Sequence, residues 1–384
     1  MGSNPTLSAI FYHGSLPNLS CPWKEISRTE NEDGRDRMLD GRPRILIIRL
    51  SAIGDVVRVL PVLRNLRRQF PQAQIDWVVE SKAAGVVEGH PDLDDVLVFE
   101  RSPKFLESTK TFRRLCRRVQ SNQYDIVLDF HGIAKSGLIA WSSRAPERYG
   151  FAAPRGQEGS YLALTHRVKL PSPDLNRVEE NLLLCDEVAG RVNPADATIF
   201  VPEDAQEHVN EFFDAEFEGG KLVVAMHAPV DRKEKQWPLP YYSELADMLL
   251  ADGRFDVFLT WGPGQFDIAA GVAANCRRNP TLAPETTDLK MLAWLLHRSD
   301  LYFGGDTGPM HIAATMDTAV IAVFGGTDPR KHAPYNKRSK VLYVEPKGTK
   351  PEADAVKRLE MITPEKAYDA CVEFVRREFL ERSE

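Results

Sequence analysis

Four short stretches of this sequence combine glycine with residues that can carry charge or move a proton. They are S-A-I-G-D (51–55), D-F-H-G-I-A-K-S-G (129–137), M-H-A-P-V-D-R-K-E-K-Q-W-P (226–238) and Y-F-G-G-D-T-G-P-M-H-I-A-A (302–314). Each stretch follows, or includes the end of, an apolar run that is typical of a buried strand. Ligands of open α/β sheets bind outside the carboxyl ends of the strands, so these stretches are the candidate functional sites.

The first stretch puts a carboxylate, Asp55, in the first turn of an expected helix, after a glycine, Gly54, that permits a tight turn. The G-x-G-x-x-G spacing of a dinucleotide site is missing. Two interpretations of Asp55 stay open from these residues alone. It could be a helix-start carboxylate that the helix dipole stabilises, or a general base that removes a proton from a substrate.

The second and third stretches supply cations, an imidazole and a hydroxyl. His131, Lys135 and Ser136 cluster at the start of an expected helix, where ordinary capping is the alternative explanation. Lys235 stands two residues before Trp237 and could be a solvated charge. A loop this basic at a strand end also suits a phosphate group.

The fourth stretch gives the strongest signal. A strand ends in two glycines, and Asp306, Thr307 and Gly308 lead into a helix that carries His311 in its first turns. Backbone N–H groups, a hydroxyl and an imidazole then converge where the helix dipole favours an anion. A histidine buried in the core is the alternative for His311 alone, but the joint spacing predicts a diphosphate site.

Alternating elements must hold these stretches in place. From Arg44 onward, apolar runs alternate with helical patterns, and the alternation restarts at 222–226 after a pause near 190–220. Apolar runs without polar alternation suit parallel strands that are buried on both faces, joined by right-handed crossover helices. The sequence therefore predicts an α/β fold with two doubly wound domains. Residues 1–40 are polar and are expected to form a poorly ordered extension.

Composition narrows the class of protein. The chain has 384 residues, 43% of them hydrophobic, and a net charge of −6, which suits two globular domains and does not favour nucleic-acid binding. Its five cysteines are scattered, which fits reduced thiols in the cytoplasm. No apolar run reaches the 18 residues of a membrane-spanning helix. Asp92 and Asp94 form a D-x-D in a loop before a strand, and no metal site is predicted.

In this order, the four stretches resemble the motifs of glycosyltransferase family 9, the ADP-heptose:lipopolysaccharide heptosyltransferases. The resemblance covers roughly residues 44–380. It is carried by Ser51, Gly54 and Asp55, by Gly132, Lys135 and Ser136, by Lys235, Trp237 and Pro238, and by Asp306, Thr307, Gly308 and His311. The segments 148–156 and 176–181 also resemble acceptor-side segments of the family.

The resemblance implies the glycosyltransferase B fold, in which two doubly wound Rossmann-like domains face a central cleft. It implies that residues 41–205 bind the acceptor and that residues 220–350 bind the nucleotide sugar. The last helix, 363–381, would cross back and complete the first domain. No cofactor and no metal are implied.

The resemblance also implies an inverting transfer of heptose from ADP-heptose to the inner core of lipopolysaccharide. Asp55 would be the base, and Lys235 would stabilise the leaving diphosphate. The expected donor site comprises Asp306, Thr307, Gly308, His311, Gln265 and Asp267, and the expected acceptor site comprises Gly54, His131, Gly132, Lys135, Ser136 and Arg148. Basic residues of the first domain would attract an anionic acceptor and hold the enzyme at the cytoplasmic face of the inner membrane. Those residues are Arg58, Arg64, Arg67, Arg68, Lys104, Lys110, Arg113, Arg114, Arg117 and Arg118, and solvated helix faces are the alternative explanation for them.

Two departures from the family pattern leave the nucleotide open. Pro229 and Val230 stand where the family often has hydroxyl residues, and Gln265 or Asp267 must replace a glutamate associated with the ribose. A family 9 enzyme that uses another nucleotide sugar, for O-antigen or another surface glycan, is the alternative. An oxidoreductase would need the G-x-G-x-x-G that is missing, and a non-enzymatic nucleotide-binding protein would not need Asp55 and Lys235 together.

Overall fold

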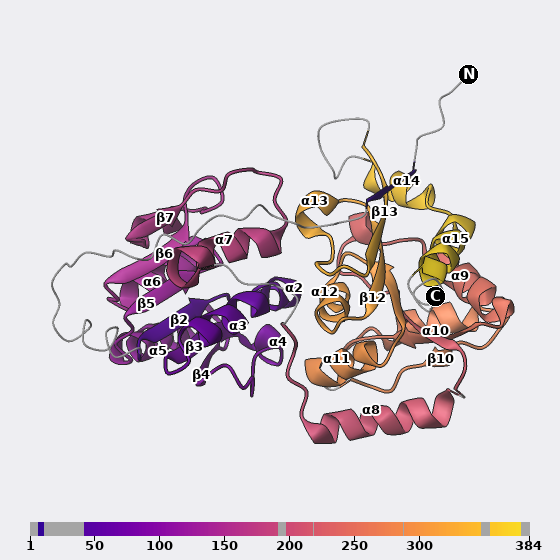
Figure 1. Ribbon diagram of the computed structural model, residues 1–384, viewed down its shortest axis with the longest axis horizontal. Coiled ribbons are helices and arrows are strands. Elements are labelled where there is room, and N and C mark those ends of the chain that lie inside the picture. Colours follow the sequence, from indigo (N-terminus) through magenta and orange to yellow (C-terminus); the bar gives the residue numbers. More distant parts are fainter. Residues whose placement is uncertain are drawn as a thin grey trace. The chain divides into compact units, whose positions relative to one another are not determined.

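The structure is a computed structural model that describes residues 7–10, 42–190, 197–217, 219–286, 288–346 and 354–377. The described chain forms two compact units (Figure 1). The first domain is made of residues 42–200. The second domain is made of the residues from 201 onward together with the strand at 7–10.

The first domain is built on a parallel sheet with the strand order β4-β3-β2-β5-β6-β7. Its strands are β2 (Arg44–Ile48), β3 (Gln74–Glu80), β4 (Asp95–Phe99), β5 (Ile126–Asp129), β6 (Glu147–Phe151) and β7 (His166–Val168). Its helices are α2 (Ile53–Val57), α3 (Leu60–Gln69), α4 (Ser81–Ala84), α5 (Phe105–Ser121), α6 (Ala134–Ser142), the 3₁₀ helix η1 (Ser160–Ala163) and α7 (Arg177–Ala189). The apolar run of β2 is fully buried from Ile45 to Ile48, as expected for a central strand.

The helical pattern after β2 is divided between two helices, α2 and α3. Pro61 is the second residue of α3. A proline inside one continuous helix would lack an N–H group and would clash with the carbonyl of Val57. The break leaves α2 as a short helix whose third residue is Asp55.

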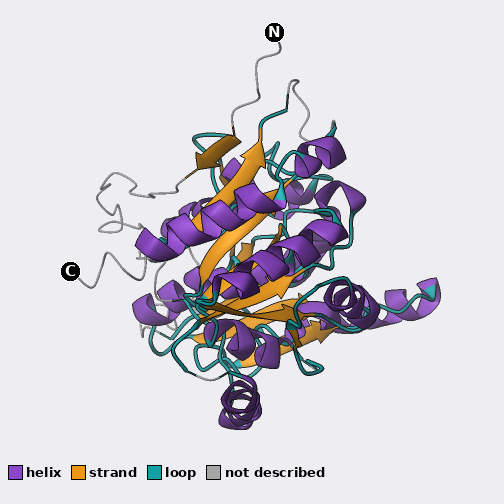
Figure 2. Cartoon of the chain, turned by 90° about the vertical axis from the view of Figure 1, so that its right-hand side faces the viewer, coloured by secondary structure: helices purple, strands orange, loops and turns teal. Residues whose placement is uncertain are grey.

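The second domain contains a sheet in the order β1-β13-β12-β11-β8-β9-β10, in which β1 alone is antiparallel. Its strands are β1 (Leu7–Ile10), β8 (Leu222–His227), β9 (Phe255–Thr260), β10 (Thr281–Leu282), β11 (Leu301–Gly305), β12 (Ala319–Phe324) and β13 (Ser339–Val344). Its helices are α8 (Glu203–Glu216), η3 (Lys233–Lys235), α9 (Leu239–Asp252), α10 (Phe266–Ala274), α11 (Leu289–His297), α12 (Gly308–Thr315), α13 (Pro329–His332), α14 (Ala355–Glu360) and α15 (Pro364–Val375). Helices lie on both sides of these strands (Figure 2). The predicted α/β class with two doubly wound domains is thus confirmed.

The strand order of each sheet has one point where the chain changes direction. In the first domain this point lies between β2 and β5, which are neighbours although β3 and β4 intervene in the sequence. In the second domain it lies between β8 and β11. Crevices form at such points because the flanking crossover helices leave on opposite faces. All four candidate stretches follow one of these four strands.

The structure corrects three expectations about the ends and the middle of the chain. Residues 7–10 form strand β1, so this part of the expected extension is ordered; residues 1–6 and 11–41 lie outside the described residues. Helix α15 packs against α9, and Cys371 and Phe374 join the core of the second domain instead of completing the first. Residues 378–381 of the expected last helix are not described.

The third correction concerns helix α8 (Glu203–Glu216), which lies within the pause expected near 190–220. Pro202 is its N-cap, and the helix buries Val209 and Phe213 while its remaining residues are largely polar. Flanking prolines and glycines concealed the helix in the sequence. Its burial of only two residues also made its apolar periodicity weak.

Candidate active site

Asp55 follows β2 and forms ion pairs with two arginines of its own domain. Its Oδ2 atom lies 2.5 Å from the Arg49 guanidinium, and its Oδ1 atom lies 3.1 Å from that of Arg58. The N–H of Ala52 also donates to Oδ2, at 3.4 Å. The Asp55 side chain is 33% exposed, so the carboxyl group is fixed in direction while the side chain keeps contact with solvent.

The arginines determine the charge of this carboxyl group. Burial alone would raise the pKa of Asp55, but Arg49 and Arg58 hold that pKa well below its usual range. Asp55 is therefore a carboxylate at any physiological pH. It can accept a proton only transiently, as a general base does when a hydroxyl group attacks in the same step.

Asp129 organises the loop after β5, and sequence reasoning missed it. This fully buried carboxylate accepts hydrogen bonds from the backbone N–H groups of His131 and Gly132, at 3.0 and 3.1 Å, and from the Ser136 hydroxyl at 2.8 Å. Gly132 has φ +74°, a left-handed conformation that favours glycine. The loop is thus fixed from beneath, because three donors converge on one buried carboxylate.

Of the expected acceptor residues in this loop, His131 keeps some exposed surface. Its Nδ1 atom accepts the N–H of Leu50 at 3.3 Å, so the proton of the neutral ring is on Nε2. Burial, followed by the charge of Arg49, lowers the pKa of His131 to about 3. His131 is therefore neutral at physiological pH and can donate a hydrogen bond through Nε2.

The structure gives four other predicted acceptor residues a role within the fold. Ser136 is fully buried and its hydroxyl donates to Asp129, so its side chain holds the loop, and a contact with an acceptor stays a prediction. Lys135 forms an ion pair with Glu80 at 3.1 Å and keeps 34% of its side chain exposed. Arg148 donates to the carbonyl groups of Ala145 and Ala163, and these hydrogen bonds hold the end of η1 in place. It supports the fold in this structure, and Gly54 is likewise buried, within α2.

Two arginines of the segments 148–156 and 176–181 meet at one buried glutamate near this loop. Arg155 and Arg177 both pair with Glu180, at 2.8 and 2.6 Å. Arg155 also lies within 3.4 Å of the carbonyl oxygens of Phe130 and His131. Arg49 donates to the same Phe130 carbonyl at 2.7 Å. The carboxyl end of β5 is therefore surrounded by guanidinium groups, which suits an anionic ligand.

Lys235 and Asp306 form the centre of the second constellation, in the second domain. The Lys235 ammonium lies 2.7 Å from Oδ2 of Asp306 and 3.3 Å from the Asp306 carbonyl oxygen. The lysine side chain is 21% exposed, whereas the aspartate is 4% exposed. Burial would raise the pKa of Asp306, but His311 and Lys235 hold it well below its usual range. The aspartate is therefore an anion, and it holds the Lys235 ammonium in a fixed position.

Thr327, which follows β12, completes this constellation and was missed in the sequence. Its hydroxyl donates to the same oxygen of Asp306, at 2.8 Å. The Gly326 N–H donates to the Glu234 carbonyl at 2.9 Å, and a Cβ atom at Gly325 would lie 2.5 Å from that oxygen. The glycines thus let the loop of Lys235 lie against the end of β12. A G-G-T after an apolar strand was the available signal.

Helix α12 begins beside these residues. Thr307 is its N-cap, yet the threonine hydroxyl makes no capping hydrogen bond. Gly308 and Pro309 form the first turn, and His311 lies one turn in, with Nε2 at 3.7 Å from Oδ1 of Asp306. Free N–H groups at a helix start favour an anion. Together with Lys235, they form an arrangement that can neutralise a diphosphate.

The two candidate ribose residues stand at the start of α10. Gln265 is the N-cap, and its side-chain oxygen accepts the Gly262 N–H at 3.1 Å within its own turn. Asp267 is exposed in the first turn of the helix. Both follow β9, the neighbour of β8 in the sheet. That one of the two contacts the ribose stays a prediction.

The D-x-D carboxylates serve the first domain in another way. Asp92 pairs with Arg64 at 2.9 Å, and Asp94 pairs with Arg67 at 2.6 Å. Two of the arginines expected to attract an acceptor are thus engaged within the fold. Among the described residues, no group of three or more His, Cys, Asp or Glu side chains is arranged to hold a metal ion.

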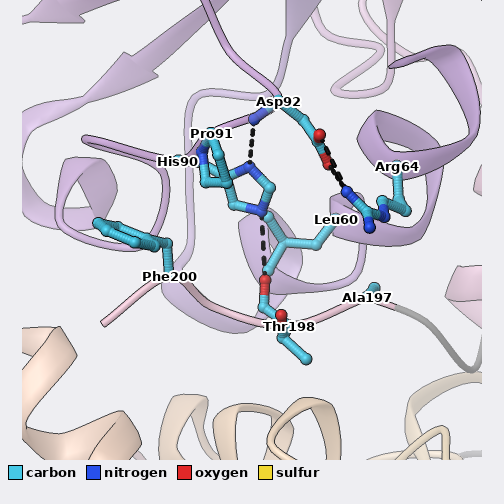
Figure 3. A pocket seen from close by; sticks show the side chains of 8 residues that line it. All are labelled: Leu60, Arg64, His90, Pro91, Asp92, Ala197, Thr198 and Phe200. Carbon is cyan, nitrogen blue, oxygen red and sulfur yellow. Dashed lines mark hydrogen bonds and ion pairs between the residues drawn. The ribbon is translucent and has the colours of Figure 1, made fainter. Parts of the chain in front are cut away.

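Asp92 also lines a cavity of about 180 Å³ in the first domain (Figure 3). In this cavity the imidazole of His90 lies between the Asp92 N–H, at 3.1 Å, and the Thr198 carbonyl, at 3.3 Å. The cavity borders the loop that precedes β4, at the amino end of that strand. It is therefore separate from the carboxyl ends of β2 and β5, where Asp55 and His131 lie.

Comparisons with known proteins point to one family. Residues 112–363 match the model of glycosyltransferase family 9 (heptosyltransferase). The match covers more than half of the chain. The chain therefore belongs to glycosyltransferase family 9, and it is a glycosyltransferase.

Curated relatives resemble the chain over most of their length. The lipopolysaccharide core heptosyltransferase OpsX of Haemophilus influenzae is 26% identical over 306 residues, which cover 78% of this chain and 84% of the relative. Lipopolysaccharide heptosyltransferase 1 of Escherichia coli K12 is 26% identical, with 78% and 92% covered. The enzyme of the same name from Pseudomonas aeruginosa is 28% identical, with 74% and 79% covered.

Solved structures share the fold. A family 9 glycosyl transferase from Veillonella parvula superposes with a TM-score of 0.77 at 21% identity, covering 88% of this chain and 98% of the other. E. coli heptosyltransferase WaaC with ADP superposes with a TM-score of 0.69 at 24% identity, covering 86% and 99%. The fold is therefore the glycosyltransferase B fold. No helix among the described residues is both long enough and apolar enough to span a membrane.

Proposed function

We propose that this chain transfers a heptose from ADP-heptose to the inner core of lipopolysaccharide, with inversion at the anomeric carbon. The observation that carries the proposal is the pair of constellations at the two switch points. A fixed, ionised carboxylate, Asp55, follows β2 of one domain. An anion-binding site that includes Lys235 follows β8 and β11 of the other domain. The names of the relatives, all lipopolysaccharide heptosyltransferases, support this donor and this acceptor.

In the proposed reaction, a hydroxyl oxygen of the acceptor attacks the anomeric carbon of the heptose. The bond from that carbon to the diphosphate oxygen breaks, and ADP leaves. Asp55 accepts the proton of the attacking hydroxyl. A positioned general base typically contributes about 10²–10⁴-fold to such a step.

The leaving diphosphate gains negative charge, and the second constellation opposes that charge. Lys235 and the first N–H groups of α12 would contact the diphosphate, and His311 would contribute a further hydrogen bond. Asp306 would act through Lys235 and His311, because it is buried behind them. Thr327 would act in the same indirect way, by holding Asp306 in position.

The first domain would bind the acceptor. Arg49 and Arg155 donate to carbonyl groups at the carboxyl end of β5, and Arg177 shares Glu180 with Arg155. These guanidinium groups suit the phosphates and carboxylates of an inner-core glycolipid. An acceptor that is a lipid requires the enzyme to work at a membrane surface. We therefore propose a cytoplasmic enzyme that contacts the cytoplasmic face of the inner membrane peripherally.

The base is tested by Asp55→Asn, with Asp92→Asn as a matched control in the same domain. We expect Asp55→Asn to lower kcat by about 10²–10⁴-fold with ADP binding unchanged, because the donor site lies in the other domain. Asp92→Asn should keep turnover near wild type. Wild-type turnover by Asp55→Asn would remove the base role.

The donor is tested by thermal shift with ADP-heptose, UDP-sugars, GDP-sugars and NAD. The second candidate, a family 9 enzyme for another surface glycan, rests on Pro229 and Val230 and on the missing glutamate near Gln265. Stabilisation by ADP-heptose above the other nucleotides supports the first proposal. A larger shift with a UDP- or GDP-sugar would select the second.

A further inference from the structure

Large apolar side chains are exposed on three neighbouring elements of the first domain. Phe105 and Leu106 begin α5, Leu138 and Trp141 belong to α6, and Leu162 lies on η1. Trp141 is 66% exposed and Leu138 is 54% exposed. Helix α6 packs against both α5 and η1, so these side chains come from adjacent elements. Contiguous exposed apolar groups mark interaction sites more often than scattered single ones do.

The helical geometry of α6 explains how Leu138 and Trp141 form an exposed row. Leu138 and Trp141 are three residues apart, which puts them on one side of the helix. The opposite side buries Ile139 and Ala140, and a Cβ atom at Gly137 would lie 3.0 Å from the backbone of Ser160 at η1. The exposed row therefore faces outward beside η1. Tryptophan is enriched at membrane interfaces, where an apolar ring meets polar headgroups.

A basic stripe on α5 accompanies this row. Leu106, Lys110, Arg113 and Arg117 follow one another at spacings of four, three and four residues, so they share one side of the helix. In the described part of the chain, no ion pair engages Lys110, Arg113 or Arg117. Other basic residues nearby are paired: Lys104 with Glu107 and Arg118 with Asp95.

We propose that Leu106, Leu138 and Trp141, flanked by Lys110, Arg113 and Arg117, form a surface that inserts shallowly into an anionic lipid bilayer. Charge selects the occupant, because unpaired cations beside apolar side chains match anionic headgroups above acyl chains. The inference deepens the proposed function and rests on its lipid acceptor. Helix α6 starts in the loop of the predicted acceptor residues, and Trp141 lies only about 10 Å further along, at 1.5 Å per residue.

Vesicle binding tests the surface in the full chain. The probe is flotation with vesicles of phosphatidylethanolamine and phosphatidylglycerol at 3:1, compared with pure phosphatidylcholine. Leu138→Ser/Trp141→Ser should weaken binding by about tenfold or more for each side chain removed. Arg113→Gln/Arg117→Gln should weaken it by about thirtyfold at low salt. At 0.5 M NaCl the effect of the arginine variant should shrink, while that of the serine variant should persist.

Matched controls come from the second domain. Val356, which is 47% exposed on α14, supplies Val356→Ser, and exposed Arg277 and Arg278 supply a double change to Gln. Both controls should bind vesicles like wild type. All variants should unfold at the wild-type temperature, since the changed side chains are exposed.

Each outcome decides the proposal. If the serine variant binds vesicles like wild type, or if wild type binds none at low salt, insertion is overturned. It is also overturned if wild type is a dimer that the serine variant converts to a monomer without any effect on vesicles, because the row is then a protein interface. Turnover with a deacylated, water-soluble acceptor separates the two proposals. The serine variant should keep that turnover, and if wild type itself lacks it, the proposed function fails while the vesicle result stands.

Discussion

Replacing Lys235 by methionine should affect both the stability of the second domain and its affinity for ADP. The change leaves the Asp306 carboxylate, 4% exposed, with Thr327 and the imidazole of His311 as its remaining polar contacts. Removing one partner of a buried pair costs up to about 3–5 kcal/mol. Because Lys235 is 21% exposed and Thr327 remains, we expect a loss of about 2–3 kcal/mol.

Scanning calorimetry measures the first effect. At about 2–4 °C per kcal/mol for a domain of this size, the unfolding temperature should fall by roughly 5–10 °C. Lys221→Met is the matched control, because Lys221 pairs with Asp256 at 2.9 Å in the same domain but is 47% exposed. Breaking that surface pair should cost less than about 1 kcal/mol.

Titration calorimetry with ADP measures the second effect. The Lys235→Met variant should lose about 1.5–3 kcal/mol of binding free energy, the range for a hydrogen bond to a charged group. Adding Asp306→Asn should restore most of the stability, because no buried charge is then left alone, and should not restore ADP affinity. Wild-type stability of the single variant would refute the ion pair, and wild-type affinity would refute the position of the donor site.

Three further predictions concern pH, backbone conformation and metal. Because two arginines hold the pKa of Asp55 below its usual range, kcat/KM should stay flat as pH falls from 8 to about 5. Arg49→Gln raises that pKa, so kcat/KM at pH 5 should drop relative to its value at pH 8. The matched change Arg64→Gln should leave the pH profile unaltered. Gly132→Ala should lower the free energy of unfolding by about 1–2 kcal/mol, because φ is +74° although a Cβ atom has enough space. Gly271→Ala inside α10, where nothing lies within 4 Å of the added Cβ atom, should raise the free energy of unfolding by up to about 1 kcal/mol. Chemical denaturation measures both changes. Activity should survive excess EDTA, since cationic groups serve the diphosphate; complete loss that Mg²⁺ or Mn²⁺ restores would contradict this.

The sequence predicted the strand ends well because buried parallel strands leave long apolar runs. The stretches around Asp55 and Asp306 could be found for the same reason: each follows such a run and places a glycine directly before the aspartate. What the runs cannot show is which side chains turn back into the fold. Ser136 and Arg148 looked like ligand-binding residues by type, yet one is fully buried and the other donates to backbone carbonyls.

The residues missed in the sequence act through contacts between distant segments. Arg49 approaches Asp55 locally but also reaches the carbonyl of Phe130, 81 positions away. Thr327 and Asp306 meet only because β11 and β12 are neighbours in the sheet. Local spacing carries no information about such pairs. The domain predicted for the C-terminal helix was wrong for a similar reason. Its amphipathic pattern predicts a helix but not the domain that covers its apolar side.

Strand β1 pairs with β13, so that residue 7 lies opposite residue 344. In terms of the chain, the first domain is an insertion that separates one edge strand of the second domain from everything else in it. During synthesis β1 leaves the ribosome before the first domain and β13 leaves after it, so the two strands can pair only once all the residues between them have emerged. A fragment that begins at residue 201 would expose that edge as a template for another strand. Separate expression of the second domain should therefore include the first strand, joined by a linker or supplied as a peptide.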